Sequence, residues 1–529
     1  MRNKKLQVWL PFMFALMTAI GMLIGYKLRE DTAGGSVLKN TSNSSVNEII
    51  NLINKQYVDP IGGDSIQTKA IQELLSHLDP HSVYIPANRL QDINDEMHGN
   101  FQGIGVEFQI FSDTLNVVNV MPDGPSDKAG LQTGDKFLAV NDSIVIAGTK
   151  KTPADIRKIL RGGAGSSVKI KILRNGQAKD FVIKRGIVPL YSLDAAYMLT
   201  AETGYIRLNK FSETTHKEFM QAMEMLQAKG LKKLVLDLRG NGGGLMDQAV
   251  SIAEDFLGSD KLIVYTNGAH LGKTEYRSKG DGLFETTPLA VLVDETSASA
   301  SEILSGALQD WDRATIIGRR TFGKGLVQQQ YMLSNGGALR LTVARYYTPL
   351  GRNIQKPYNK GFEQYQDELI ERFHDGEVVQ GDTSKPKGKA YKTPKGRMVY
   401  GGGGITPDIF IPFDTTLQPK PIIQLYYKGT LNQFVYNYYM QNKAALTQIK
   451  TPEDLSNQYA QYSAGIWNEL VSYAKKDSIN IDVISLNAKN DLLQKIGGLI
   501  AKQIWRTEGY YEMENIHDPM IKKALETLK

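Results

Sequence analysis

The chain of 529 residues contains no cysteine, and histidine is scarce, with seven in total. The absence of cysteine excludes disulfide bonds, thiolate metal sites and a cysteine nucleophile together, and a chain without thiols suits export into an oxidising compartment. A large excess of charge of one sign is also missing, because 62 Lys and Arg against 56 Asp and Glu leave a net charge of +6. That balance does not indicate a nucleic-acid-binding surface.

Charged residues are absent from one stretch near the amino terminus, Val8–Tyr26, which follows three basic residues. As a helix rising about 1.5 Å per residue, this stretch would span about 28 Å, close to the thickness of a bilayer's hydrocarbon core. The positive charges before it predict a single-pass anchor at residues 8–26, with 1–7 in the cytoplasm and the remainder outside. A cleaved signal peptide is the competing interpretation, although residues 33–35 (Ala-Gly-Gly) form only a weak cleavage site.

The pattern of the remaining chain changes several times, which predicts separate structural regions. These are a flexible Gly- and Ser-rich tether at 27–45, a helical region at 46–98, a module of short alternating strands at 99–187, a region of alternating strands and helices at 188–413, and a helical region at 414–529. In the fourth region, the segment Leu234–Leu238 is apolar except for Asp237, and Leu289–Val293 is apolar throughout. Such strands between helices indicate a multidomain α/β protein with a mostly parallel sheet covered by helices.

Runs of small residues follow both of these strands, where a helix then starts. The first run, Asp237–Gly244, contains four glycines, and its free backbone N–H groups are suited to face an anion; a tight turn with positive φ is the simpler interpretation. The second, Asp294–Ile303, contains Ser297, Ser299 and Ser301 at the carboxyl end of a strand, where α/β sheets bind ligands. A helix cap with small residues for close packing is the alternative there.

A third motif, Gly318–Gly325, nearly matches the phosphate-binding pattern G-x-x-x-x-G-K-[ST]. However, Gly325 stands where the pattern requires a hydroxyl residue for Mg²⁺, and Leu326–Leu333 alternates like a strand instead of starting a helix. Nucleotide binding is therefore not indicated, and Lys324 needs another explanation. A buried lysine loses its proton more readily than a solvated one, whereas an exposed turn lysine is the ordinary alternative.

Taken together, the three motifs are consistent with one acyl-transfer site. A serine would be the nucleophile, a neutral Lys324 the base, and the amides of the glycine run an oxyanion hole. Histidine is not required, because Ser–Lys arrangements operate without it. Neither His216 nor His270 stands in the sequence context of a charge-relay partner.

Six segments resemble blocks of one protein family and occur in that family's order. They are Leu78–Ser82, Phe101–Val106, Leu236–Gly244, Ser297–Asp310, Gly323–Gln328 and Gly403–Asp408. On these residues the chain resembles the C-terminal processing peptidases (tail-specific proteases), which are membrane-anchored or exported serine proteases with a Ser–Lys dyad. The resemblance covers about Leu75–Pro412. It implies a βα-layered, ClpP/crotonase-like protease core at 188–413, held on the periplasmic or extracytoplasmic side of a bacterial inner membrane.

The resemblance also implies roles for individual residues. Ser299 is the implied nucleophile, because the family serine lies three residues before the glutamate of a Ser-x-x-Glu motif, here Glu302. Lys324 is the implied base, and Gln328, four residues later, orients the lysine.

The implied oxyanion hole consists of the backbone N–H groups of Ala300 and Gly243, with Gly244 as the alternative to Gly243. If the helix begins near Ala300, only Ser299 combines the loop-to-helix position with an amide donor immediately after it. Ser297 and Ser301 are therefore the weaker candidates for the nucleophile.

The module at 99–187 resembles a PDZ domain. Gly103, Ile104, Gly105 and Val106 match the loop whose amides bind a peptide's terminal carboxylate while the peptide adds as a strand. The resemblance thus implies protein substrates with apolar C-termini. In some members an arginine near the position of Arg161 links the bound peptide to the active site, which makes Arg161 the candidate regulatory residue.

The leading interpretation is a membrane-anchored serine endopeptidase that processes or degrades exported proteins from or near their C-termini. No metal, ATP or organic cofactor is implied, and no nucleic-acid partner. The alternative is a non-catalytic PDZ-based scaffold that binds exported proteins. The helical region at 414–529 is longer than the family core requires, and self-association as a homo-oligomer or binding of an adaptor protein are open roles for it.

Overall fold

The computed structural model describes residues 17–18, 45–59, 63–111, 113–142, 144–146, 151–359, 361–381 and 388–529. Among these residues, no helix combines the length and the apolar character that crossing a bilayer requires. The expected anchor at 8–26 lies outside the described residues, apart from Met17 and Thr18. The anchor therefore stays a prediction.

The chain divides into two compact units, Met1–Leu74 and Leu75–Lys529. Helix α2 (Ser45–Gln56) lies in the first unit, and α3 (Gly63–Ser76) ends just beyond the boundary between them. The second unit begins with strand β1 (Val83–Ile85) and helix α4 (Ala87–His98). The described part of the expected helical region at 46–98 thus contains three helices and, unexpectedly, one strand.

The module that follows α4 is a six-stranded antiparallel sheet with strand order β3-β4-β5-β7-β8, in which β6 pairs with β5. Its elements are β3 (Val106–Phe111), β4 (Thr114–Val120), α5 (Pro125–Ala129), β5 (Lys136–Val140), β6 (Ile144–Val145), α6 (Pro153–Leu160), β7 (Ser167–Arg174) and β8 (Gln177–Lys184). The paired strands β2 (Asn100–Gly103) and β9 (Gly186–Pro189) lead the chain in and out. Because β3 is an edge strand, its outer side is open to pairing with a further strand.

The main sheet of the second unit has six strands in the order β10-β11-β12-β15-β16-β21. They are β10 (Leu193–Met198), β11 (Thr203–Leu208), β12 (Lys233–Asp237), β15 (Leu289–Val293), β16 (Thr315–Gly318) and β21 (Ile409–Phe410). Neighbouring strands are parallel from β11 to β21, and β10 pairs antiparallel at one edge. This confirms the α/β architecture with a mostly parallel sheet.

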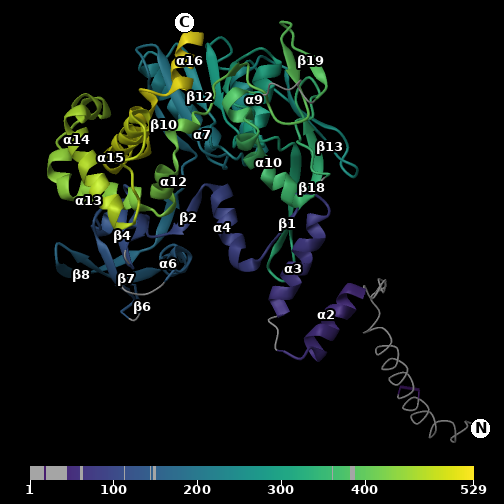
Figure 1. The fold of residues 1–529 in the computed structure, drawn as a ribbon. Coiled ribbons are helices and arrows are strands. Elements are labelled where there is room, and N and C mark those ends of the chain that lie inside the picture. Colours follow the sequence, from purple (N-terminus) through teal and green to yellow (C-terminus); the bar gives the residue numbers. More distant parts are fainter. Residues whose placement is uncertain are drawn as a thin grey trace, which may run out of the picture. The chain divides into compact units, whose positions relative to one another are not determined.

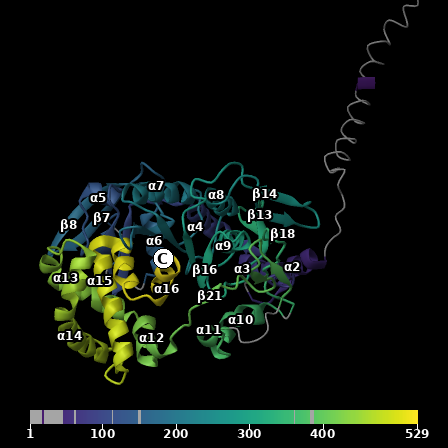
Figure 2. The same cartoon turned by 90° about the horizontal axis from the view of Figure 1, so that it is seen from above.

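Alternate residues of the central strands serve two different cores. Leu236 of β12 and Val291 of β15 pack with α7 (Thr215–Ala228), α8 (Met246–Phe256) and α9 (Ala300–Asp310), and every residue of α9 is buried. Val235 and Leu292, whose side chains point to the opposite face, pack instead with the last helix of the chain, α16 (Pro519–Thr527). Figure 1 and Figure 2 show α16 in yellow beside the strands of this sheet.

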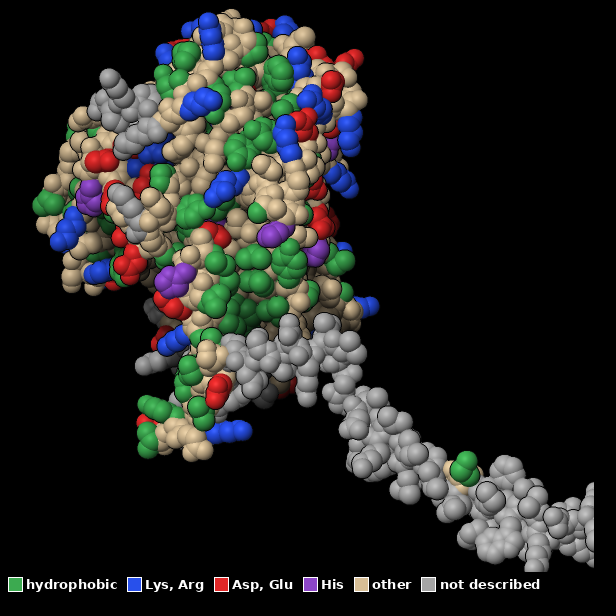
Figure 3. Space-filling view, turned by 90° about the vertical axis from the view of Figure 1, so that its right-hand side faces the viewer, with side chains coloured by type: hydrophobic (Ala, Val, Ile, Leu, Met, Phe, Trp, Pro, Cys, Tyr) green, Lys and Arg blue, Asp and Glu red, His purple; other side chains and the backbone are tan. Residues whose placement is uncertain are grey.

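A second sheet has the order β1-β18-β13-β14, with β17 also paired to β18. Its longer elements are β13 (Leu262–Asn267), β14 (Thr274–Arg277), β17 (Leu326–Met332) and β18 (Ala338–Tyr347). The segment after β18 forms α10 (Phe362–His374), α11 (Glu377–Gln380) and the hairpin of β19 (Ala390–Lys392) and β20 (Met398–Tyr400). On the face of the second unit that Figure 3 shows, Lys and Arg side chains are interspersed with Asp and Glu, in line with the near balance of charge.

The region after residue 414 is helical, as the sequence predicts. It contains the short 3-10 helix η1 (Thr415–Leu417), α12 (Lys420–Tyr427), α13 (Thr430–Leu446), α14 (Pro452–Lys476) and α15 (Leu486–Asn515), followed by α16. Helices α12 to α15 have a hydrophobic core of their own. Helix α15 is kinked at Trp505 and Arg506, where the backbone leaves helical geometry. The helical region therefore does not pack as one unit, because its last helix packs against the main sheet.

Candidate active site

Ser299 lies in the loop between β15 and α9, in a strained backbone conformation. Its φ of 56° and ψ of −113° fall in a region that non-glycine residues rarely occupy. Its N–H donates to the Glu302 carboxylate at 2.8 Å, and its carbonyl accepts from the Tyr346 hydroxyl at 3.1 Å. Such strain persists only where surrounding contacts enforce it, and it is frequent at active sites.

The neighbouring serines have structural roles. The Ser297 hydroxyl donates to the carbonyl of Leu238 at 2.8 Å, and the Ser301 hydroxyl donates to the carbonyl of Asn241 at 2.9 Å. Both side chains are fully buried, whereas Ser299 is partly exposed. Of the three serines, Ser299 is therefore the one placed to meet a substrate.

Glu302 joins the loop that carries Ser299 (the serine loop) to the loop that carries Lys324 (the lysine loop). Its side chain is fully buried, and its Oε2 accepts from the N–H groups of Ser299 at 2.8 Å and Lys324 at 2.9 Å. Its Oε1 accepts from the Thr321 hydroxyl at 2.5 Å and the Gly323 N–H at 2.8 Å. Burial raises the pKa of Glu302, and these four donors oppose that rise. The sequence indicates Glu302 only as the glutamate of the Ser-x-x-Glu motif and does not predict this role.

Lys324 lies in the loop that connects β16 to β17 and is partly buried. Burial lowers the pKa of Lys324 below its ordinary range, the Arg340 guanidinium lowers it further, and Glu302 and Asp79 oppose both effects. This lowering of the pKa is consistent with a lysine that loses its proton readily. Among the described residues, no hydrogen bond joins Lys324 Nζ to Ser299 Oγ, so the proton transfer between them stays a prediction.

Gln328 lies on β17 opposite Thr342 on β18. Its amide donates to the Thr342 hydroxyl at 3.4 Å, and that hydroxyl donates to Asp79 at 3.0 Å. Ser82, from the same turn as Asp79, donates to the other Asp79 oxygen at 2.5 Å. Within the described part of the chain Gln328 makes no hydrogen bond to Lys324, and its orienting role stays a prediction.

His81, from the same turn, was not assigned a role by the sequence. Its Nε2 lies 2.7 Å from the Tyr365 hydroxyl. Burial, aided by the charge of Lys324, lowers the pKa of His81 to about 3, so the imidazole is neutral at physiological pH. The sequence feature that could have indicated a role for His81 is its position in the Leu78–Ser82 motif. By contrast, His216 pairs with Asp255 at 2.9 Å.

The glycine run Asp237–Gly244 (the glycine loop) contacts the serine loop, as the acyl-transfer interpretation requires. Gly243 has a φ of +97°, and a Cβ there would lie 2.7 Å from the Ala298 carbonyl oxygen and 2.7 Å from Ser299 Cβ. The Gly243 N–H donates to the Asn241 side chain at 2.9 Å. Over the described residues, the N–H groups of Ala300 and Gly244 donate no hydrogen bond. These two donors are available to an oxyanion, whereas Gly243 would have to release Asn241.

The expected carboxylate-binding loop lies at the start of β3. Gly103 belongs to β2 and pairs with Gly186, while the carbonyls of Ile104 and Gly105 accept from Ser126 and Met121 at 2.9 and 3.1 Å. Gly105 has a φ of +74°. In the part of the chain that the structure describes, the N–H groups of Ile104 and Gly105 donate to no other group. They are free to bind a carboxylate beside the open edge of β3.

Arg161 follows α6 and reaches out of the β module to α4. Its guanidinium bonds Asp92 and, at 3.1 Å, Asp95, and it lies 4.9 Å from the centroid of the Phe101 ring. This arginine therefore fixes the module to the helix that precedes it. Its regulatory role stays a prediction.

Glu302 joins the loop of a strained serine at a helix start to the loop of a lysine with a lowered pKa. Such an arrangement is typical of a serine peptidase, and the antiparallel module before it is typical of a PDZ domain. The pattern of peptidase family S41 matches residues 202–364, and that of a PDZ domain matches residues 117–174. Residues 422–506 match a family of unknown function, DUF8443.

Two sequence relatives of known description support this assignment. The carboxy-terminal-processing protease of Bartonella bacilliformis is 38% identical over 314 residues, which cover 58% of this chain and 71% of that protein. A probable CtpA-like serine protease of Staphylococcus aureus is 33% identical over 347 residues, 64% of this chain and 68% of that protein. The solved photosystem II D1 C-terminal processing protease is 27% identical, with 70% of this chain and 87% of that chain covered and a TM-score of 0.35. The chain belongs to the C-terminal processing peptidases.

Proposed function

We propose that the protein is a membrane-anchored endopeptidase that processes or degrades exported proteins from or near their C-termini, with Ser299 as nucleophile and Lys324 as general base. The observation that carries the proposal is the Glu302 carboxylate, which holds the backbones of both residues. Bringing a nucleophile and its base together in one rigid frame removes much of the entropic barrier to reaction.

The proposed reaction has two stages, formation and hydrolysis of an acyl-enzyme. Neutral Lys324 takes the proton of the Ser299 hydroxyl as its oxygen attacks the scissile carbonyl. The Ala300 N–H, with the N–H of Gly244 or Gly243, stabilises the negative oxygen of the tetrahedral intermediate. The lysine then gives its proton to the departing amine, which leaves an acyl-enzyme on Ser299. A water molecule that Lys324 deprotonates releases the acid product.

The PDZ domain selects the substrate in this proposal. A free C-terminal carboxylate would accept from the N–H groups of Ile104 and Gly105, while the peptide extends the sheet along β3. A peptide with an apolar C-terminus should therefore bind at least about tenfold more tightly than the same peptide with an amidated C-terminus. Equal affinities of the two peptides, measured by fluorescence anisotropy, would argue against this mode of recognition.

The anchor at 8–26 would keep the catalytic part on the periplasmic or extracytoplasmic side of the bacterial inner membrane. Its stretch of uncharged residues after three basic ones supports this placement. Membrane fractions washed with carbonate should retain the full chain and release a variant that starts at residue 27. Release of both forms would show that the anchor is absent or cleaved.

The proposal is tested with purified protein and a reporter protein that carries an apolar C-terminal tail. Ser299→Ala and Lys324→Ala should each abolish cleavage, while circular dichroism and thermal unfolding remain close to wild type. Comparing the exported proteome of cells with Ser299 intact or replaced would identify natural substrates by their new C-termini. Binding of the tail without any cleavage by the wild-type protein would instead favour the PDZ-based scaffold.

A further inference from the structure

The last helix of the chain is part of the protease core. Met520, Ile521 and Ala524 of α16 are buried against Val235 and Leu292 of the central strands. The residue that caps this helix, Asp518, therefore lies near the ends of the strands that carry the glycine loop and the serine loop. A residue from the far end of the sequence thus contacts Arg239, at the start of the glycine loop.

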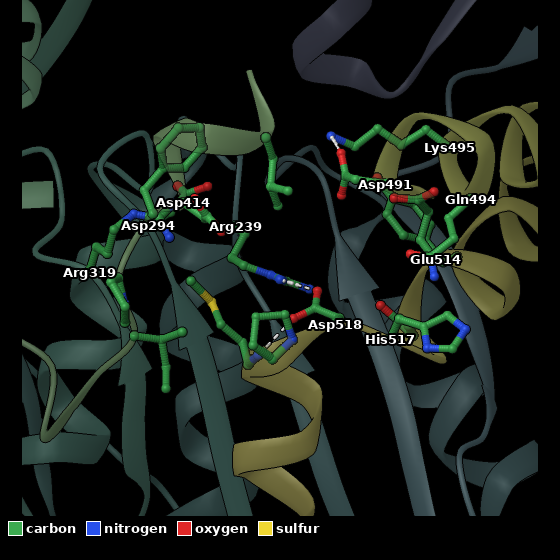
Figure 4. A pocket seen from close by; sticks show the side chains of 18 of the residues that line it. Arg239, Asp294, Arg319, Asp414, Asp491, Gln494, Lys495, Glu514, His517 and Asp518 are labelled. Carbon is green, nitrogen blue, oxygen red and sulfur yellow. Dashed lines mark hydrogen bonds and ion pairs between the residues drawn. The ribbon is translucent and has the colours of Figure 1, made fainter. Parts of the chain in front are cut away.

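Asp518 makes two separate contacts with its two oxygens. Oδ1 accepts from the N–H groups of Met520 and Ile521 at 2.7 and 3.3 Å, which caps α16. Oδ2 accepts from Arg239 Nη1 at 2.5 Å. Both residues line a cavity of about 460 Å³, and Figure 4 shows their side chains pointing toward each other. Only the second contact reaches the catalytic loops.

The charges around Arg239 explain why a carboxylate is needed there. The fully buried Asp237 accepts from both Arg207 at 2.8 Å and Arg239 at 2.6 Å. Each guanidinium also has one carboxylate of its own: Asp194 lies 3.7 Å from Arg207, and Asp518 binds Arg239. Without Asp518, Arg239 would share the single charge of Asp237 with Arg207. An incompletely paired charge in such a largely buried position is unfavourable.

Arg239 begins the turn that becomes the glycine loop. The next residue, Gly240, donates its N–H to Asp294 at 3.1 Å. Asn241 then holds both sides of the site, because its side-chain oxygen accepts from Gly243 and its carbonyl accepts from the Ala298 N–H at 3.0 Å. A displacement of Arg239 would therefore move the amides that face the developing oxyanion.

We infer that Asp518 is a positioning residue for catalysis, which pairs with Arg239 and so fixes the glycine loop in the geometry that stabilises the oxyanion. The inference rests on the proposed function. It assigns the C-terminal segment a part in the chemical step, beyond any role in binding partners.

The test is the substitution Asp518→Asn in the full chain. Asparagine keeps the oxygen that caps α16 but removes the negative charge that binds Arg239. With enzyme concentrations fixed by fluorophosphonate titration of Ser299, kcat should fall about tenfold, while KM and tail-peptide affinity stay unchanged. The affinity of a peptide boronic acid, which forms a tetrahedral adduct on serine, should weaken by a similar factor.

Two further variants separate positioning from stability. Asp518→Glu retains the charge and should recover part of kcat. Glu526→Gln removes the same charge from an exposed position on the same helix and should leave kcat unchanged. If Asp518→Asn does not fold, Asp518→Ser, which also retains a capping oxygen, makes the same measurement.

Each outcome bears on a different claim. A wild-type kcat in folded Asp518→Asn would overturn the inference and leave the proposed function intact. A loss of melting temperature with an unchanged kcat per titrated Ser299 would show a structural role only and would also overturn it. A wild-type protein that turns over no substrate would contradict the proposed function, and the inference would fall with it.

Discussion

The backbone nitrogen of Lys324 lies 2.9 Å from Oε2 of Glu302, the oxygen that also accepts from the serine loop. Through this buried carboxylate the positions of the proposed base, Lys324, and the proposed nucleophile, Ser299, depend on each other. Four donors converge on the two oxygens of Glu302, so the ionised form suits the site although burial raises its pKa.

Glu302→Gln should therefore impair both catalysis and stability. An amide offers one acceptor oxygen, and its NH₂ group would face two donors. We expect a loss of about 3 kcal/mol in the free energy of unfolding and a fall in kcat/KM of at least about 100-fold, measured by denaturant unfolding and by cleavage of the reporter. Thr321→Val, which removes one of the four donors, should have a smaller effect. A Glu302→Gln enzyme of normal activity would show that the shared carboxylate does not position the dyad.

Arg340 should set the pH dependence of activity. Its positive charge is the second cause, after burial, of the lowered pKa of Lys324. Because the proposed base is the neutral lysine, kcat/KM should rise with pH through the pKa of Lys324. In Arg340→Gln that pKa rises, so activity should fall near neutral pH and recover at higher pH. Arg345→Gln, an exposed position on the same strand, is the control; superimposable profiles for the two variants would exclude this effect of Arg340.

Alanine substitutions at the adjacent residues Gly242 and Gly243 form a matched pair that tests the role of the glycine loop. At Gly243 a methyl group would lie 2.7 Å from the Ala298 carbonyl oxygen, and the φ of +97° is unfavourable for alanine. At Gly242 a methyl group would meet no atom within 4 Å. Gly243→Ala should reduce kcat by at least about 100-fold, whereas Gly242→Ala should retain most activity. Similar kinetics for the two variants would mean that the loop does not contact the reacting centre.

Glu514 on α15 should make stability depend on pH. Burial raises the pKa of Glu514 from 4.5 to about 7; Lys495 and Arg239 oppose the rise, and Asp491 and Asp518 add to it. The folded protein keeps this proton to higher pH than the unfolded chain. The contribution of Glu514 to the free energy of unfolding is therefore complete below about pH 4.5 and declines as the pH rises to about 7.

Glu514→Gln should remove this decline, worth up to about 3 kcal/mol. Melting temperatures of wild type and Glu514→Gln, measured from pH 4 to 8 (roughly the range in which carboxylates and histidines titrate), should diverge as the pH rises toward 7 and then run parallel. Glu526→Gln serves as the exposed control. Curves that are parallel throughout would show that Glu514 does not titrate in this range.

The sequence predicts features that depend on residues close together along the chain. A largely apolar strand followed by small residues predicts the ends of β12 and β15. The Ser-x-x-Glu spacing within the family resemblance indicates Ser299. Contacts between distant segments were not predictable in this way. Asp518 and Arg239 are 279 positions apart, and nothing in the pattern of α16 distinguishes a helix that covers the main sheet from one that belongs to the helical region. The engagement of the Gly243 N–H by Asn241 likewise depends on side-chain geometry within the turn.

The central claim is that Lys324 activates Ser299, and the most direct measurement is the rate at which Ser299 is covalently modified. Intact-protein and peptide mass spectrometry can follow a fluorophosphonate adduct over time at several pH values. The account predicts an adduct on Ser299 whose rate of formation rises with pH in the wild-type protein, and no detectable adduct in Lys324→Ala over the same period. Equal rates of modification in the two proteins, or an adduct on a different residue, would contradict it.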